Sequence, residues 1–190
     1  MAYFLRTERL ALRPLAADDL DNLVALDSDP EVMRYLNGGR PTPREEAARK
    51  LAAMTAPSGP LQTWIWAAED CAGGEFLGWF SLRPDPDRGP KDVELGYRLR
   101  RTAWGRGLAS EGAAALVDKA FGELEVAQIF AKTMSVNLAS RRVMEKAGLT
   151  FVRTFFEEWP DVIAGAEHGD VEYAISRGDW ERHGELDGHP

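Results

Sequence analysis

Residues 93–134 constrain the fold most, because they predict a strand, a helix and a second strand in immediate succession. The apolar run at 93–99 is typical of a strand, the alanine-rich run at 106–121 of a helix, and the apolar run at 126–134 of another strand. Two strands joined by one helix pair in parallel within a sheet. We therefore expect an α/β fold in which 93–99 and 126–134 are parallel neighbours.

The turn between the first of these strands and the helix, 99–107, is basic and contains two glycines. Free N–H groups and the positive end of the helix dipole make a helix start a binding site for an anion. Gly105 and Gly107 let the backbone approach a bulky anion, although many turns of this composition are solvated loops. Neither the Walker spacing nor the dinucleotide spacing is present, since Ser110 stands at the third glycine position. The turn predicts a phosphate site without naming its ligand.

Composition narrows the class of protein. The chain has 190 residues, 44% hydrophobic residues and a formal net charge of −8 at pH 7, which suits one domain and disfavours a general nucleic-acid binder. No apolar run is long enough to span a bilayer, and the N-terminus lacks the apolar core of a signal peptide. The single cysteine, Cys71, fits a reducing compartment, and no metal-ligand spacing is present. We expect a cytoplasmic protein with no metal, membrane or nucleic-acid partner.

Residue patterns also place the remaining elements. Alternating polar and apolar residues predict strands at 8–13, 64–69, 76–82, 150–157 and 171–175. Helical spacing and capping residues predict helices at about 17–26, 29–37, 42–54 and 138–147, the last one ending at Gly148. Loops are expected at 57–60 and 84–90. We assign 1–177 to a single domain and 178–190 to a polar C-terminal tail.

Two motifs resemble those of the GNAT superfamily of acetyl-coenzyme A dependent N-acetyltransferases. The turn at 104–109 is similar to the family pattern Gln/Arg-x-x-Gly-x-Gly/Ala, with Trp104 in place of Gln or Arg. Residues 137–149 are similar to the second pattern, Asn-x-x-Ser-x-x-apolar-x-Glu-Lys-x-Gly-Phe. The stretch 94–109 resembles the branch of ribosomal-protein N-terminal (alanine/serine) acetyltransferases. The resemblance covers nearly the whole chain.

This resemblance implies a mixed, mostly antiparallel central sheet with helices on both faces and a splayed parallel strand pair that holds acetyl-CoA. The amides of the turn would bind the pyrophosphate, the backbone of Leu99 would pair with pantetheine like an added strand, and Asn137 would hydrogen-bond the pantetheine arm. Arg142 would approach the 3′-phosphate, with a solvated helix face as the alternative. The cofactor-binding positions implied in this way are Leu99, Trp104, Gly105, Arg106, Gly107, Leu108, Ala109, Ser110, Asn137 and Arg142.

Direct acetyl transfer needs a neutral amine, a donor for the thioester oxygen and a proton for the departing thiolate. By the resemblance, Glu94 is the candidate base, directly or through water, and the alternative is an outward-facing carboxylate. Ser140 is the candidate proton donor, because the tyrosine that many relatives carry four residues later is Met144 here. The alternative for Ser140 is a helix cap.

The sequence therefore predicts an acetyl-CoA-dependent N-acetyltransferase that acts on a primary amine. A protein N-terminus is one acceptor, and a polyamine, an aminoglycoside or an amino acid is the alternative. A non-catalytic acyl-CoA-binding module is the alternative outside enzymes. Relatives are often dimers, so a homodimer is compatible with the resemblance. Acidic residues of the N-terminal helices would suit a cationic acceptor, although exposed helix faces carry them by default: Asp18, Asp19, Asp21, Asp27, Asp29 and Glu31.

Overall fold

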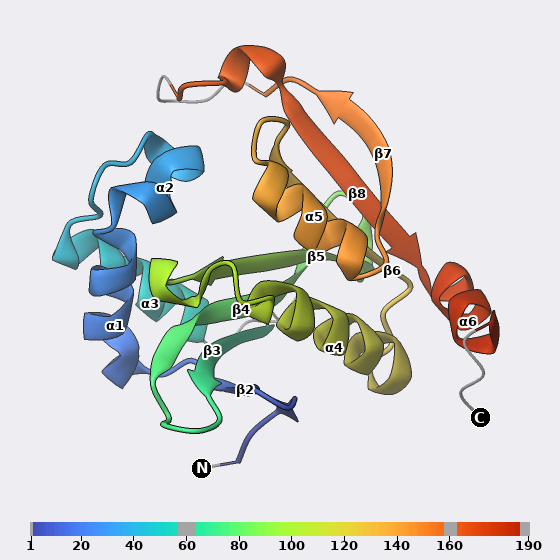
Figure 1. Cartoon of the computed structure of the whole chain (residues 1–190), viewed down its shortest axis with the longest axis horizontal. Helices are drawn as coiled ribbons and strands as arrows, with labels where there is room; N and C mark the ends of the chain where they lie inside the picture. Colours follow the sequence, from blue (N-terminus) through green and yellow to red (C-terminus); the bar gives the residue numbers. More distant parts are fainter. Residues whose placement is uncertain (1, 57–63, 158–162, 187–190) are drawn as a thin grey trace.

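The computed structural model describes residues 2–56, 64–157 and 163–186. In this part of the chain, eight strands form one sheet in the order β1-β2-β3-β4-β5-β6-β8-β7 (Figure 1). Neighbouring strands are antiparallel except β5 and β6, which are parallel as the sequence predicted. The strands are β1 (Leu5–Arg6), β2 (Leu10–Pro14), β3 (Trp64–Asp70), β4 (Phe76–Asp85), β5 (Gly89–Leu99), β6 (Gln128–Met134), β7 (Thr150–Phe155) and β8 (Asp170–Ser176).

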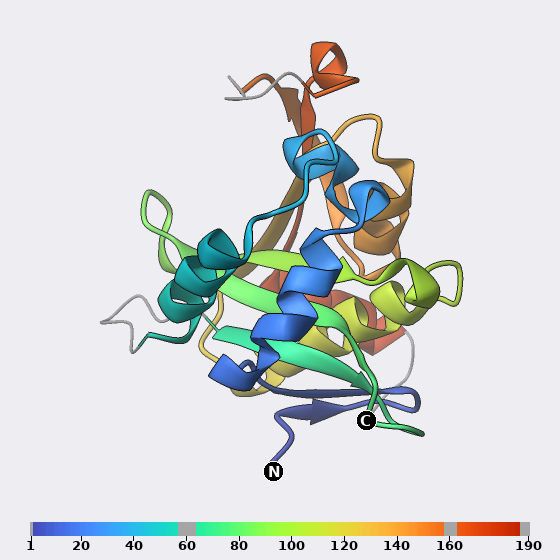
Figure 2. The ribbon, with the colours of Figure 1, turned by 90° about the vertical axis from the view of Figure 1, so that its left-hand side faces the viewer.

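Helices cover both faces of the sheet, and β3 alternates between two hydrophobic cores. Trp66 and Ala68 face the core under α4, whereas Ile65 and Ala67 face the core under α1 and α3. Figure 2 shows the strands between α3 on one side and α4 on the other, which confirms the mixed fold with helices on both faces. No helix in the described ranges is long and apolar enough to cross a membrane. The α-helices are α1 (Leu20–Asp27), α2 (Pro30–Asn37), α3 (Arg44–Thr55), α4 (Leu108–Glu123), α5 (Leu138–Lys146) and α6 (Arg177–Leu186).

The parallel pairing of β5 and β6 is short. Among the described residues, the two strands share three residue pairs, and the last joins Glu94 to Phe130. Beyond that pair β5 stays bonded to β4, and β6 stays bonded to β8. The strands therefore separate, and α4 and α5 begin after their carboxyl ends. The carboxyl ends of parallel strands are a common place for ligands in sheets of this kind.

Close packing of α4 on the sheet depends on Gly112. A Cβ atom at this position would lie 2.5 Å from Cζ of Phe80, a fully buried ring on β4. Gly122, near the end of the same helix, has no atom within 4 Å of the corresponding position. Gly112, in the first turns of α4, thus allows the helix to pack closely on the sheet.

The loop expected at 84–90 is instead the tip of a hairpin between β4 and β5. Asp85 pairs with Gly89 across the tip. Arg88 leaves the tip and donates two hydrogen bonds, of 2.7 and 2.9 Å, to Glu172 on β8. Because Glu172 is 84 residues away in the sequence, a local pattern could not predict this contact. The polar composition of residues 84–90 therefore indicated a loop.

The polar tail expected at 178–190 contains much of helix α6. The ring of Trp180 lies 5.6 Å from that of Phe121 on α4, and its Nε1 donates to Asp118 at 2.7 Å. Arg177 donates to three backbone carbonyl oxygens at and just after the end of α4. One aromatic side chain and one arginine therefore dock a segment whose composition is otherwise polar.

Several boundaries also differ by a few residues. The helix expected from 106 begins at Leu108, because Gly105 and Gly107 adopt left-handed φ values just before it. The strand expected from 126 begins at Gln128, and the short strand β1 was not predicted. The loop expected at 57–60 lies outside the described residues.

Glu172 on β8 is a buried carboxylate bound by two arginines. Besides Arg88, Arg153 on β7 donates to it at 2.9 and 3.1 Å. The hydrogen bonds of Arg88 first, and then those of Arg153, hold the pKa of Glu172 below its usual range, although burial raises it. Because Arg88 also lies 4.1 Å from the ring centre of Phe130 on β6, the cluster ties the hairpin to the far half of the sheet.

We expect Gly112→Ala to lower the free energy of unfolding by about 1–3 kcal/mol, because the new methyl group overlaps Phe80. The matched variant Gly122→Ala, on the same helix, should be neutral or more stable by up to about 1 kcal/mol. Urea denaturation followed by circular dichroism measures both. Equal effects of the two substitutions would contradict the close packing at Gly112.

We expect Glu172→Gln to lower the free energy of unfolding at pH 7 by about 1–3 kcal/mol, less than for a fully buried pair because Arg153 is half exposed. A carboxylate with a lowered folded pKa stabilises the fold above its unfolded value of about 4.3 and loses this contribution as the pH falls through the folded value. The difference between variant and parent should therefore shrink as the pH falls below the unfolded value and disappear only below the lowered folded pKa.

Urea denaturation across a pH series measures this difference. The exposed Glu125, substituted by glutamine, serves as the control and should change the free energy of unfolding by less than about 0.5 kcal/mol. A pH-independent effect of Glu172→Gln would show that the carboxylate charge is not what holds the cluster together.

Candidate active site

The glycine turn before α4 leaves the first amides of that helix without a side-chain cap. Gly105 and Gly107 have φ values of +72° and +78°, in the left-handed region that favours glycine. Gly107 is the N-cap residue, and no side chain in the described ranges caps it. The N–H groups of 108–110 therefore remain as donors at the positive end of a 16-residue helix. This is the physical basis of an anion site.

Arg9 supports the back of this turn, a contact that the sequence did not predict. Its Nη1 donates to the carbonyl oxygen of Arg106 at 2.8 Å, and its Nε donates to Glu111 on α4 at 2.6 Å. Thr7 donates to the same carboxylate at 2.5 Å. Burial raises the pKa of Glu111, but the hydrogen bonds from Thr7 and Arg9 outweigh it and hold that pKa below its usual range. A charged network thus fixes the turn to the N-terminal strands.

Asn137, rather than Ser140, caps α5. Its Oδ1 accepts from the N–H of Ser140 at 3.3 Å, and its Nδ2 donates to Thr133 at 3.1 Å. The Ser140 hydroxyl lies 2.8 Å from the hydroxyl oxygen of Tyr97 on β5, which also donates to the Ser140 carbonyl at 3.0 Å. This contact links β5 to the helix that follows β6, across the separation between the strands.

Tyr97 was not among the predicted site residues, because only the folded chain brings it to Ser140. Burial raises its pKa to about 12, against a smaller lowering by the hydrogen bond with Ser140. A phenol with this pKa stays protonated at neutral pH and acts as a hydrogen-bond donor. Gly96 and Tyr97 belong to the stretch 94–109 that resembles the family branch, but that resemblance assigned Tyr97 no role.

Glu94 lies on the other face of β5 from Tyr97. Tyr97 packs against the core under α4, so alternation along the strand places Glu94, Gly96 and Arg98 on the opposite face. The side chain of Glu94 is 26% exposed and accepts a hydrogen bond from Arg83 at 2.6 Å. The structure therefore places Glu94 and Ser140 on opposite sides of β5, the strand that separates from β6.

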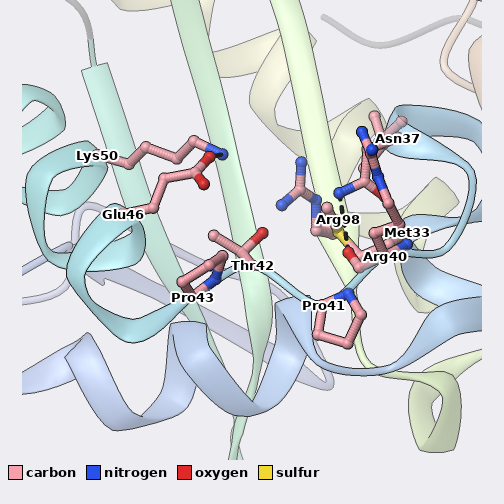
Figure 3. A pocket seen from close by; sticks show the side chains of 10 residues that line it. Met33, Asn37, Arg40, Pro41, Thr42, Pro43, Glu46, Lys50 and Arg98 are labelled. Carbon is pink, nitrogen blue, oxygen red and sulfur yellow. Dashed lines mark hydrogen bonds and ion pairs between the residues drawn. The ribbon is translucent and has the colours of Figure 1, made fainter. Parts of the chain in front are cut away.

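A pocket of about 520 Å³ lies beside Arg98 on this second face of β5. Residues of α2, α3 and the segment between them form most of its wall, including Asn37, Thr42 and Glu46. Figure 3 shows the side chains of Arg98, Lys50 and Thr42 directed toward a common space. The pocket and Glu94 thus share one side of the strand.

Comparison with known proteins identifies the family. The model of the acetyltransferase (GNAT) domain matches residues 9–150. The chain belongs to the GNAT acetyltransferase family. It is 40% identical over 188 residues, covering 94% of this chain and 78% of the relative, to the FsC-acetyl coenzyme A-N(2)-transacetylase of Aspergillus fumigatus. The chain is an N-acetyltransferase.

Solved GNAT structures have the same fold. The spermidine N-acetyltransferase of Vibrio cholerae, in complex with CoA and spermine, superposes with a TM-score of 0.76 and 18% identity over 92% of this chain and 99% of that chain. RimL, a ribosomal alpha-N-protein acetyltransferase in complex with CoA, has the same score and identity over 92% and 98% of the two chains. At these identities the likeness shows the GNAT fold and leaves the acceptor open.

Two predicted cofactor positions of this GNAT enzyme, Trp104 and Leu99, are hydrogen-bonded to each other, which the sequence did not indicate. Trp104, which departs from the family pattern, donates its Nε1 to the carbonyl oxygen of Leu99 at 2.8 Å. That carbonyl, expected to face pantetheine, therefore already has one donor, although a carbonyl oxygen can accept two.

Arg142, expected near the 3′-phosphate, is exposed on α5, whereas its neighbour Arg141 donates to Tyr173 at 3.1 Å.

The acidic residues of the N-terminal helices do not form a free anionic surface for a cation. Five of the six predicted residues form ion pairs with arginines in the described part of the chain. The pairs are Asp19 with Arg13, Asp21 with Arg44, Asp27 with Arg98, Asp29 with Arg101 and Glu31 with Arg34. No group of three or more His, Cys, Asp or Glu in the described ranges is placed to hold a metal ion.

Proposed function

We propose that this GNAT enzyme transfers an acetyl group from acetyl-CoA directly to a primary amine of a small molecule. The observation that carries the proposal is the uncapped, glycine-opened start of α4 at the edge where β5 and β6 separate. Amide donors at a helix start suit a pyrophosphate, and an unpaired strand edge suits the amides of a pantetheine chain. Solved relatives with this fold bind coenzyme A, which supports the choice of donor.

In this proposal Glu94 accepts the proton that the amine loses as its nitrogen bonds to the acetyl carbon. Glu94 shares one face of β5 with the pocket, so an acceptor in the pocket reaches it without crossing the strand. Arg83 binds one oxygen of the carboxylate at 2.6 Å and holds the group in place. The second carboxylate oxygen can accept a hydrogen bond from the amine or a water molecule.

Ser140 donates the proton that the departing sulfur takes up as the carbon–sulfur bond breaks. Its hydroxyl lies on the opposite side of β5 from Glu94, where the start of α5 faces the separated strands. The protonated Tyr97 holds this hydroxyl and can return a proton to it. Acid and base are therefore kept apart, on the two sides of the strand along which the acetyl donor binds.

The pocket favours a small molecule over a protein N-terminus. Its volume of about 520 Å³ falls within the range of roughly 300–1,000 Å³ that is usual for small-molecule sites. The relative at 40% identity is named for an N(2) nitrogen of FsC. A protein N-terminus stays the second candidate, favoured by the likeness to RimL, whose identity to this chain is 18%.

Turnover of acetyl-CoA with a panel of small amines and N-terminal peptides tests the proposal. Glu94→Gln should lower kcat/KM by about 100-fold at pH 7, and the deficit should shrink as the pH rises and more of the amine is neutral. Ser140→Ala should lower kcat by at least about tenfold. Thiol release and product mass measure the rates, with the exposed variant Glu125→Gln as the control. Absence of acetylated product across the panel would refute the proposal.

Gly107→Val should weaken coenzyme A binding by at least about tenfold, because the side chain fills the approach to the α4 amides and strains a left-handed φ. Calorimetry with coenzyme A measures the affinity. Gly89→Val, at a hairpin position with φ +104° and no atom within 4 Å of where a Cβ would lie, imposes similar backbone strain far from the turn and should leave the affinity unchanged. An unchanged affinity in Gly107→Val would place the phosphate site elsewhere.

A further inference from the structure

We propose that the acceptor amine carries a carboxylate, and that Arg98, Thr42 and Lys50 bind this carboxylate in the pocket between α2, α3 and β5. The inference rests on the proposed function, since it names the substrate class of the same site. Two features of the pocket carry it: an unpartnered buried hydroxyl and a shielded guanidinium with N–H donors to spare.

The hydroxyl of Thr42 is the clearer of these features. Thr42 is 4% exposed, and its Oγ1 is a buried polar side-chain atom with no hydrogen-bond partner among the described residues. A buried polar group without a partner is costly, and such groups are rare in folded proteins. Thr42 lines the pocket, and Figure 3 shows its hydroxyl on the side of Arg98 and Lys50. An oxygen atom of a bound ligand would supply the missing partner.

Arg98 supplies a cation with donors to spare. Its side chain is 19% exposed, and its Nη1 donates to Asp27 at 2.5 Å. A guanidinium has five N–H donors in a planar fork that matches a carboxylate. The ring of Trp79 lies 5.2 Å beneath the guanidinium and helps to fix its plane. Arg98 can therefore hold Asp27 on one side and a ligand carboxylate on the other.

The charged side chains of the pocket wall are largely paired. In the described part of the chain, Arg98 is paired with Asp27 and Lys50 with Glu46. Lys50 lies 2.7 Å from the Glu46 carboxylate and holds its pKa below the usual range. A polyamine would bring further positive charge against Arg98 and Lys50, whereas a carboxylate can accept from the N–H groups of Arg98 that Asp27 does not use.

The strand sets the distance between the two ends of such an acceptor. Glu94 and Arg98 lie on the same face of β5, four residues apart, which corresponds to about 13 Å along the backbone. The long side chain of Arg98 shortens this span, and the pocket lies beside it. An acceptor with its amine near Glu94 and its carboxylate at Arg98 therefore needs a spacer of several bonds.

The first experiment compares three acceptors of one length: 6-aminohexanoate, its neutral amide and 1,6-diaminohexane. The enzyme with saturating acetyl-CoA should acetylate the carboxylate at least about tenfold more efficiently than the other two, because a hydrogen-bonded charge pair replaces a neutral or repulsive contact. A series from 3-aminopropanoate to 8-aminooctanoate should show an optimum of kcat/KM at an intermediate length.

The second experiment uses Thr42→Val, which keeps the shape of the side chain and removes the hydroxyl. The variant should be at least as stable as the parent, because it loses an unpaired buried group. Its kcat/KM for 6-aminohexanoate should fall by about tenfold, with less than about a twofold change for the amide. Thr154→Val, at an exposed position on β7, is the matched control and should change neither value.

Lys50→Gln gives an independent test of charge. It should lower kcat/KM for the carboxylate by about threefold to tenfold, whereas Arg49→Gln, the same charge change on the adjacent exposed residue, should have little effect. Arg98 is left intact, because its removal would also leave the buried Asp27 unpaired.

The outcomes separate this inference from the proposed function. If the diamine or the amide is acetylated as well as the carboxylate, the enzyme is an amine acetyltransferase and the carboxylate site is wrong. If no amine is acetylated, the proposed function fails, and calorimetry of 6-aminohexanoate with the CoA-saturated enzyme decides the pocket on its own. Binding that is weakened by Thr42→Val and absent for the diamine supports the site, and equal binding of all three ligands overturns it.

Discussion

The architecture of this site depends on the early end of the pairing between β5 and β6. The last pair joins Glu94 to Phe130, and beyond it each strand keeps a single hydrogen-bonded neighbour among the strands of the described residues. The facing strand edges then carry backbone N–H and C=O groups that need partners. An extended ligand with amides of its own can supply these partners, and the amides at the start of α4 lie at the end of the same gap. One interruption of a ladder therefore creates both halves of the coenzyme site that we propose.

Side chains on both sides keep this gap in shape. Gly112 lets α4 approach Phe80, so the helix start stays close to the end of β5. The hydrogen bonds between Tyr97 and Ser140 hold the start of α5 to β5. These contacts are short, and those of Tyr97 with Ser140 are partly buried, so they fix the starts of both helices against β5 without a ligand. A site that is formed in advance loses less conformational entropy when a ligand binds.

The sequence predicted the parts of the molecule that local patterns determine. The strand–helix–strand unit, the glycine turn and the helix that begins after Asn137 follow from periodicity, glycine conformation and capping, and the structure has all three. Contacts between distant residues could not be predicted in this way. Arg9 reaches Arg106 over 97 residues, and Trp180 reaches Asp118 over 62. Such partners depend on the path of the whole chain, so α6 and the support of the turn were missed.

The charge that the composition suggested for the acceptor site differs from the charge that the folded structure presents. The acidic residues of the N-terminal helices suggested a cationic acceptor, yet most of them are neutralised by arginines from α2, α3, β2 and β5. What a ligand meets is the charge that remains after such pairing. Arg98 keeps N–H donors that its pair with Asp27 does not use, and the unpartnered hydroxyl of Thr42 adds another. A chain of net charge −8 can therefore present donors for an anion in one pocket, because net charge is a property of the whole surface and recognition is a property of one site.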